Sequence, residues 1–334
     1  MPPILEVSDL VRKYGDFAAV DGVSFTMQEG EVFGLLGPNG AGKTTVISVL
    51  TGVLPPTSGT ARIGGHDIVR EQAAAKRLNG LVPQDLALYP TLSARDNLEF
   101  FGRIYGLSGA ELRGRVDAML DLVGLEDRAD DPIERYSGGM KRRANIAAGL
   151  LHQPRLLFLD EPTVGVDPQS RHHIFESVRR LNQERGMSIL YTSHYMEEVE
   201  LLCDRVAIMD QGRIIAIDTV KSLVSMLAGV IHVGLRKADE ELLRALAALP
   251  TVNSAVDAPR PLRSSLPDDE AGDGPVAPPA DYQMVKLEAG DVQRSLVDVI
   301  ALLGQKGIEI VSLQVLEPNL ENVFLHLTGK RLRE

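Results

Sequence analysis

The sequence predicts an α/β domain over residues 1–228, with a mainly helical subdomain inside it, and a smaller α+β domain over residues 229–334. Two apolar runs, Arg155–Asp160 and Ser188–Ser193, have the character of strands buried on both faces, and a helical stretch separates them. A third apolar run leads into a glycine-rich turn. After residue 228 the expected order is strand, helix, strand, strand, helix, strand.

Length and composition exclude several classes of protein. The chain has 334 residues and 44% of them are apolar, so two or three domains with buried cores are expected. The 35 basic and 46 acidic side chains give a net charge of −11, which disfavours non-specific binding to nucleic acid. No apolar run approaches the roughly 20 residues of a membrane span. With Cys203 as the only cysteine and no secretory signal pattern, we expect a cytoplasmic protein.

The first half of the chain predicts strands and then helices. Residues 4–27 alternate in short apolar runs separated by glycine and aspartate, a pattern typical of antiparallel strands. The apolar run Glu31–Leu36 predicts a buried strand, followed by a helix over about Lys43–Val53. Ser93, three residues before an aspartate, has capping-box spacing ahead of helical periodicity. The helical subdomain is therefore expected over about 90–150.

The last hundred residues predict a ferredoxin-like arrangement. Strands are expected near 230–235, 252–256, 282–287 and 308–316, and helices near 239–249 and 292–303. Residues 257–281 hold six of the 19 prolines and several acids. This composition predicts a disordered acidic loop between the second and third strands of the domain.

A phosphate-binding loop is the most specific motif. The stretch fits G-x-x-x-x-G-K-[ST] between an expected strand and an expected helix. Glycines let backbone N–H groups converge on phosphate oxygens, and the helix N-terminus adds positive potential. We expect Lys43 to meet the β- and γ-phosphates, Thr44 to ligate Mg²⁺ and Thr45 to reach the α-phosphate. The loop consists of Gly37, Pro38, Asn39, Gly40, Ala41, Gly42, Lys43 and Thr44.

Two adjacent acids close the apolar run Leu156–Leu159. Beside a phosphate loop, Asp160 is placed to hold Mg²⁺ through water, and Glu161 is placed to polarise the attacking water. The alternative interpretation is an ordinary strand end whose acids face solvent.

A second glycine-rich helix start follows later in the chain. Ser137, Gly138 and Gly139 precede a helical run, which is typical of an anion site. Because one nucleotide offers one γ-phosphate end, this second site should serve the nucleotide of another copy related by two-fold symmetry. A plain serine-capped turn is the alternative.

Taken together, these motifs resemble the ATP-binding subunits of ABC transporters over residues 4–225. They occur in the order phosphate loop, Gln84, Tyr136–Met140, Leu156–Pro162, Val164–Asp167 and His194. The resemblance implies a P-loop NTPase cassette that binds ATP and Mg²⁺. It further implies adenine stacking on Tyr14, metal ligation and relay to the membrane subunit by Gln84, linkage of two active sites by Asp167, and γ-phosphate contact by His194. For a lone histidine a structural role is the alternative.

Three further stretches resemble the drug and polysaccharide exporter branch, which includes daunorubicin-resistance proteins. They are Tyr136–Met140, Thr163–Pro168 and Glu317–Phe324. The branch implies a homodimer that hydrolyses ATP, polytopic membrane permease subunits as partners, and a peripheral position on the cytoplasmic face of the membrane. The apolar stretch Leu86–Leu92 is expected to meet a short helix of the membrane subunit, with packing inside the helical subdomain as the alternative.

Other ATPases of the same type are the competing hypothesis. A soluble ABC-type ATPase acting on DNA would carry long coiled coils, yet no sustained heptad run occurs. One acting on ribosomes would usually contain two cassettes, and this chain has one phosphate loop. A P-loop kinase would not need Ser137 or His194. We therefore expect no nucleic-acid partner, and the cargo cannot be read because its contacts lie in the membrane subunits.

Overall fold

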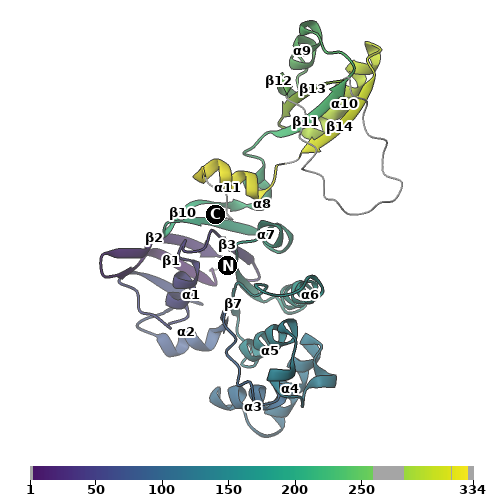
Figure 1. The fold of residues 1–334 in the computed structure, drawn as a ribbon. Coiled ribbons are helices and arrows are strands. Elements are labelled where there is room, and N and C mark those ends of the chain that lie inside the picture. The colour runs from purple at the N-terminus through teal and green to yellow at the C-terminus, as the bar shows by residue number, and fades with distance from the viewer. Residues whose placement is uncertain (1–2, 259–281, 317, 330–334) are drawn as a thin grey trace. The chain divides into compact units, whose positions relative to one another are not determined.

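The computed structural model describes residues 3–258, 282–316 and 318–329 (Figure 1). The chain forms two compact units. The first comprises Met1–Val220 and Leu327–Glu334, and the second comprises Lys221–His326. The division falls eight residues before the boundary expected at 228. Of the predicted acidic loop, residues 259–281 lie outside the described residues, whereas 257 and 258 form the end of a strand.

The first unit contains two sheets. An antiparallel sheet has the order β2-β1-β4-β5, made of β1 (Leu5–Tyr14), β2 (Phe17–Met27), β4 (Ser58–Ile63) and β5 (His66–Asp67). The second sheet has the order β10-β9-β3-β8-β7-β6 and is parallel except for its β10 edge. Its strands are β3 (Val32–Leu36), β6 (Asn79–Val82), β7 (Leu156–Asp160), β8 (Ser188–Ser193), β9 (Arg205–Asp210) and β10 (Arg213–Thr219).

The core of this unit explains why these runs are strands. Every residue of β3, β7 and β8 is buried, as expected for parallel strands covered on both faces. The helices of this α/β core are α1 (Lys43–Leu50), α2 (Gln72–Leu78), α6 (Pro168–Arg185) and α7 (Met196–Leu202). One hydrophobic cluster joins the antiparallel sheet to the parallel one, with Phe25 stacked on Phe33 at 5.1 Å between ring centroids.

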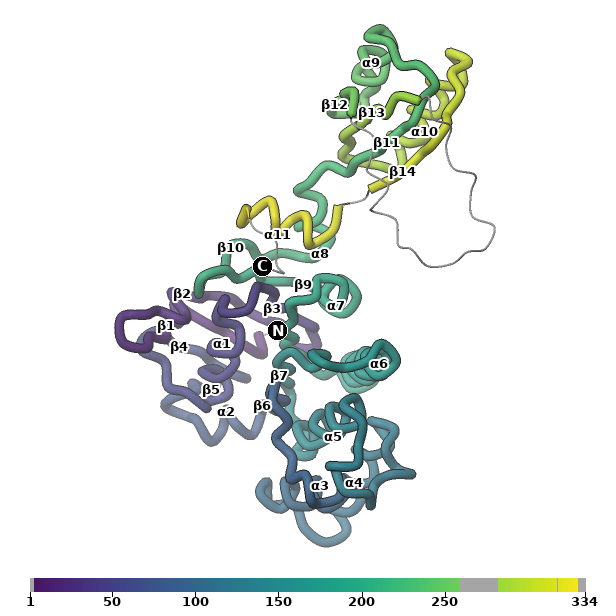
Figure 2. Tube along the Cα trace, in the orientation of Figure 1, coloured from purple at the N-terminus to yellow at the C-terminus, as the bar shows by residue number. Residues whose placement is uncertain are grey.

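The predicted helical subdomain consists of α3 (Ala94–Ile104), α4 (Gly109–Val123) and α5 (Gly138–Leu150), with 3₁₀ turns at Glu126–Arg128 and Ile133–Arg135. These helices gather away from the antiparallel sheet (Figure 2). The capping box at Ser93 is confirmed, because its hydroxyl accepts from the Asp96 amide at 3.0 Å and the Asp96 carboxylate accepts from the Ser93 amide.

The second unit has the predicted ferredoxin-like order. Its elements are β11 (Gly229–Leu235), α9 (Glu240–Ala247), β12 (Val252–Ala258), β13 (Gln283–Ala289), α10 (Val292–Gln305) and β14 (Ile310–Leu316). They form an antiparallel sheet in the order β12-β13-β11-β14, with α9 and α10 contributing to its core. The sequence analysis did not predict α8 (Val220–Val224) or α11 (Leu320–Thr328), nor α2 and α7 of the first unit.

Candidate functional site

The phosphate loop joins β3 to α1, as the sequence predicted. Glycine is required at its first position, since a Cβ atom on Gly37 would lie 2.5 Å from the Met209 carbonyl oxygen. Gly42 has a φ of 103° and passes so close to Ala19 that a Cβ atom would lie 2.4 Å from its carbonyl oxygen. Gly42 is also the N-cap of α1 and offers no side-chain cap. Backbone amides at this helix start are therefore available to an anion.

The Lys43 side chain turns back over the loop. Its Nζ donates to the carbonyl oxygens of Gly37 at 2.7 Å and Pro38 at 3.2 Å, and it lies 3.1 Å from Glu161 Oε1. Lys43 is only 4% exposed, so its charge acts in surroundings where Coulomb interactions are weakly screened. The ammonium is thus held at the centre of the loop, beside the carboxylate predicted to activate water.

The two predicted acids lie where β7 and β8 end side by side. Asp160 and Thr192 are partners in the parallel register, and Thr192 Oγ1 lies 2.8 Å from Asp160 Oδ1. The same hydroxyl oxygen accepts from the Glu161 amide at 2.9 Å. Burial raises the pKa of Asp160, while hydrogen bonds from Thr192 and Thr44 oppose that rise. Thr44 Oγ1 lies 3.3 Å from Asp160 Oδ1, so a hydroxyl and a carboxylate meet as the Mg²⁺ hypothesis requires.

Glu161 occupies an unusual backbone conformation. Its φ is 46°, in the left-handed region that favours glycine. Such strain is found at functional sites when the surrounding structure fixes it. The other carboxylate oxygen of Glu161, Oε2, lies 3.1 Å from His194 Nδ1, and His194 follows directly after β8. Lys43, Glu161 and His194 therefore converge from three separate elements.

These residues border a cavity of about 710 Å³. Eleven of the predicted nucleotide-binding or catalytic residues line it, namely Tyr14, Asn39, Gly40, Ala41, Gly42, Lys43, Thr44, Thr45, Gln84, Glu161 and His194. Phe17, Ala19 and Val164 line it as well and were not predicted. Phe17 is the strand partner of Tyr14 across the β1–β2 turn, so two aromatic rings border one end of the cavity.

The second glycine-rich helix start lies elsewhere in the chain. Ser137, Gly138, Gly139 and Asp167 are not among the described residues that line the cavity. Gly139 and Asp167 are instead linked through Ser170, since a Cβ atom on Gly139 would lie 2.0 Å from Ser170 Oγ. Ser170 donates its amide to Asp167 Oδ1 at 2.9 Å, and this bond lowers the pKa of Asp167. Ser137 Oγ accepts from the Met140 amide at 3.2 Å and still has its own O–H to donate.

Sequence reasoning missed one buried carboxylate beside the site. Glu198 is 2% exposed, and its Oε2 accepts from Thr163 Oγ1 at 2.8 Å, Tyr191 Oη at 2.9 Å and Ser193 Oγ at 2.9 Å. It therefore ties the segment after Glu161 to the strand end before the histidine. Its one sequence signal is a glutamate between the apolar residues of α7, which periodicity alone marks as a solvent position.

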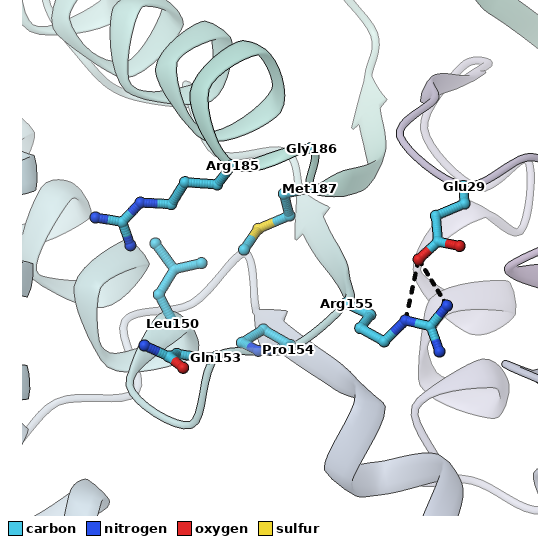
Figure 3. A pocket seen from close by; sticks show the side chains of 8 residues that line it. All are labelled: Glu29, Leu150, Gln153, Pro154, Arg155, Arg185, Gly186 and Met187. Atoms are coloured by element: carbon cyan, nitrogen blue, oxygen red, sulfur yellow. Dashed lines mark hydrogen bonds and ion pairs between the residues drawn. The ribbon is translucent and has the colours of Figure 1, made fainter.

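A second cavity, of about 320 Å³, lies at the opposite end of β7 and β8 (Figure 3). Arg155 is held there by Glu29, with Nη2 2.6 Å from Oε1. The other lining residues are Leu150, Gln153, Pro154, Arg185, Gly186 and Met187. Because parallel sheets bind ligands at the carboxyl ends of their strands, we assign no nucleotide role to this cavity.

Comparisons with known proteins identify the family. A family model described as ABC transporter matches residues 20–164. The linearmycin resistance ATP-binding protein LnrL of Bacillus subtilis is 45% identical over 333 residues, which cover 99% of this chain and 100% of that protein. The chain belongs to the ATP-binding subunits of ABC transporters. The Nod factor export ATP-binding protein I of Ralstonia nicotianae is 37% identical to this ABC subunit. The match covers 99% of the ABC subunit and 96% of the Ralstonia protein.

Solved structures agree with this assignment. CbiO1 of Clostridium perfringens, part of the ABC transporter complex cbiONQ, is 30% identical with a TM-score of 0.62, over 75% of the ABC subunit and 97% of that chain. A dimeric ATP-binding cassette in a post-hydrolysis state bound to ADP and Pi is 25% identical with a TM-score of 0.59, over 64% and 98% of the two chains.

Family membership defines the activity. The chain is an ATP-binding and ATP-hydrolysing subunit of a transport system. The resemblance to the drug and polysaccharide exporter branch is confirmed by the relatives, which do not favour a soluble ATPase acting on DNA or ribosomes. Across the described ranges, no helix combines the length and the apolarity of a bilayer crossing.

Proposed function

We propose that this chain binds MgATP in the 710 Å³ cavity and drives export through separate membrane subunits. The observation that carries the proposal is the convergence of Lys43, Glu161 and His194 on that cavity from three elements. The phosphate loop would hold the triphosphate, with Thr45 at the α-phosphate. Tyr14 would stack on adenine, because it lines the same cavity beside Phe17.

The donor set fits Mg²⁺. This ion takes oxygen ligands and is usually bound by one or two carboxylates together with phosphates and waters. Thr44 and Asp160 place a hydroxyl and a carboxylate 3.3 Å apart, and Gln84 lines the adjoining cavity. When bound, the ion neutralises charge on the phosphates. Thr44 and Gln84 would bind the ion directly, and Asp160 would hold it through a water molecule.

The contacts of Lys43 suggest how nucleotide would free the base. The ammonium has three protons and already three acceptors: the carbonyls of Gly37 and Pro38 and the Glu161 carboxylate. A γ-phosphate at Lys43 would take the place of Glu161, because the two loop carbonyls are fixed by the backbone. Glu161 could then accept a proton from the attacking water, while His194 and Lys43 stabilise charge that develops on the phosphate.

The complete site would combine two copies of the chain. Ser137, Gly138 and Gly139 lie outside the cavity that Lys43 and Glu161 border, yet they form the start of a 13-residue helix, where an anion is stabilised. In a two-fold homodimer each copy would present these residues to the nucleotide held by the other. Asp167 packs near Ser170 beside the same helix start, which suits its expected role as a link between the two sites.

Glu161→Gln tests this proposal. We expect the variant to bind ATP and to form a stable ATP-dependent dimer in sedimentation velocity, because closure needs the phosphates and not the base. Turnover should fall about 100- to 10,000-fold, the usual range for losing a general base. Wild-type turnover would require another base, and a variant that stays monomeric at saturating ATP would remove the two-copy arrangement.

The membrane partner would dock on an apolar surface made of Leu86, Leu88 and Tyr89. Leu86 is 42% exposed and Tyr89 48%, and the Tyr89 ring packs edge-on against Phe100 at 5.0 Å. Exposed apolar clusters of this kind mark interaction sites. By this arrangement the chain would lie peripherally on the cytoplasmic face of the membrane, held by polytopic permease subunits whose own contacts select the cargo.

Replacing these three residues with serine tests the docking surface. We expect basal ATPase to survive and co-purification with the membrane subunits to be lost. The matched control is Val53→Ser with Val69→Ser, because these residues are exposed by 63% and 56% and lie in connecting segments outside the proposed docking surface. Retained co-purification of the triple variant, or equal loss in the control, would count against this surface.

A further inference from the structure

Arg142 is a buried cation held by backbone carbonyls. It lies on α5, five residues after Ser137, and is 7% exposed. Its Nη1 donates to the carbonyl oxygen of Gln84 at 2.5 Å and lies 3.3 Å from that of Pro83, while Nη2 lies 3.5 Å from the carbonyl oxygen of Val164. Among the described residues no carboxylate is within ion-pair distance. Three carbonyl dipoles therefore solvate a guanidinium that stays charged inside proteins.

The next turn of α5 contacts the same segment. Asn145 is 2% exposed, its Nδ2 lies 3.4 Å from the Pro83 carbonyl oxygen, and its Oδ1 accepts from the Ala87 amide at 3.3 Å. Residues three apart share one face of a helix. Arg142 and Asn145 therefore clasp residues 83–87, the segment that contains Gln84 and leads into the proposed docking surface.

The other end of α5 is fixed to the parallel sheet. A Cβ atom on Gly80 would lie 2.3 Å from the Gly149 carbonyl oxygen, so β6 and the last turn of α5 are in direct backbone contact. Ser137 is about 7.5 Å along the helix axis from Arg142 at 1.5 Å per residue. Arg142 is thus one of the contacts that set the position of the Ser137 helix start relative to Gln84, together with Asn145 and the Gly149 backbone contact.

We propose that Arg142 is a positioning residue that couples Gln84 in one nucleotide site to the Ser137 helix start presented to the other. This inference rests on the proposed two-copy function. A planar guanidinium can donate to Gln84 and Val164 at once because its N–H groups point in fixed, divergent directions, which an ammonium cannot reproduce. Displacement of the Gln84 segment must then move the start of α5 or break buried charge-assisted hydrogen bonds.

The neighbouring Arg143 provides a matched control on the same helix. Its Nη1 donates to the carbonyl oxygens of Val123 at 2.6 Å and Gly124 at 3.1 Å. Val123 is the last residue of α4, and Gly124 is its C-cap. Burial lowers the pKa of both guanidinium groups. The two arginines thus differ chiefly in what they hold, the Gln84 segment in one case and a helix end in the other.

The test measures ATP-dependent dimerisation with hydrolysis blocked. Arg142→Lys and Arg143→Lys are each made in the full-length Glu161→Gln chain, and dimerisation at saturating ATP is followed by sedimentation velocity. Binding of a fluorescent ATP analogue to the monomer is measured in parallel. We expect Arg142→Lys to weaken dimerisation about tenfold while monomer affinity stays within about twofold, and Arg143→Lys to leave both unchanged. In chains that retain Glu161, the KM for ATP should stay constant while kcat falls.

Each outcome decides a different point. If Glu161→Gln alone does not dimerise, the two-copy function fails and Arg142 is not at issue. If it dimerises and the two lysine variants behave alike, the coupling role of Arg142 is wrong. Should Arg142→Lys fold poorly, Arg142→Met removes the buried charge and keeps an unbranched side chain. Arg142→Met should weaken dimerisation at least as much, and normal dimerisation of it would overturn the inference.

Discussion

The two glycine-rich helix starts of this chain, at α1 and at α5, differ in what surrounds them. The N-cap of α1 is Gly42, which offers no side-chain cap, and the cavity beside it receives Lys43, Glu161 and His194. The N-cap of α5 is Ser137, whose hydroxyl accepts from its own helix and whose neighbours contact the start of α6. One helix start thus borders the cavity with its catalytic candidates, and under the proposed two-copy arrangement the other would serve the nucleotide held by a second copy. The comparison therefore distinguishes residues expected to bind the nucleotide within one chain from residues expected to act when two chains close around it.

The largest expected effect is on ATP affinity, at the helix start of α1. Lys43→Ala should reduce ATP affinity at least about 100-fold, because it removes the one ammonium group held within the phosphate loop. Calorimetric titration of the monomer with MgATP measures this directly. Affinity close to that of the wild type would place the triphosphate elsewhere.

At the helix start of α5 we expect turnover to fall while ATP affinity is kept. Ser137→Ala should leave ATP affinity of the monomer within about twofold and reduce turnover about 10- to 100-fold, because its O–H would reach only the partner's nucleotide. Losing the N-cap also destabilises the helix by about 1 kcal/mol, whatever its role in turnover. Ser93→Ala removes the equivalent cap of α3 and is the control for stability. Equal loss of turnover in both variants would reduce Ser137 to a structural cap.

A smaller effect is expected within the half-site. Thr192→Val removes the hydroxyl that contacts Asp160 and the Glu161 amide and keeps a side chain of similar shape. Burial raises the pKa of Asp160 and the Thr192 hydrogen bond lowers it. Its loss should raise the pKa further, so the carboxylate is protonated at higher pH. We expect the acidic limb of the turnover profile to move to higher pH, with kcat at neutral pH falling about tenfold. An unshifted limb would show that Asp160 does not control it.

Sequence patterns predicted what depends on local chemistry. The loop from Gly37 to Thr44, the buried strands β7 and β8 and the capping box at Ser93 each carry their own signal in residue type and spacing. Register between strands has no such signal, so the pairing of Asp160 with Thr192 could not be read.

Buried polar side chains were equally hidden. Arg142 stood in a run of basic residues after the glycine pair, which resembles a solvated helix face. Its acceptors are the backbone carbonyls of Pro83 and Gln84, about 60 residues earlier in the chain, and of Val164, 22 residues later, and no pattern of residue types reveals such contacts. Periodicity also missed the nine-residue helix α11.

Mixing two inactive variants tests the shared site most directly. Lys43→Ala disables the phosphate loop of one chain, and Ser137→Arg blocks the exposed start of α5 in the other. Each pure homodimer should be inactive, but a mixed dimer contains one site with both lesions and one with neither. With random pairing, half of the dimers are mixed and half of their sites intact, so turnover should recover to about a quarter of the wild-type value. No recovery on mixing, with ATP-dependent dimers still formed, would contradict a site built from two chains.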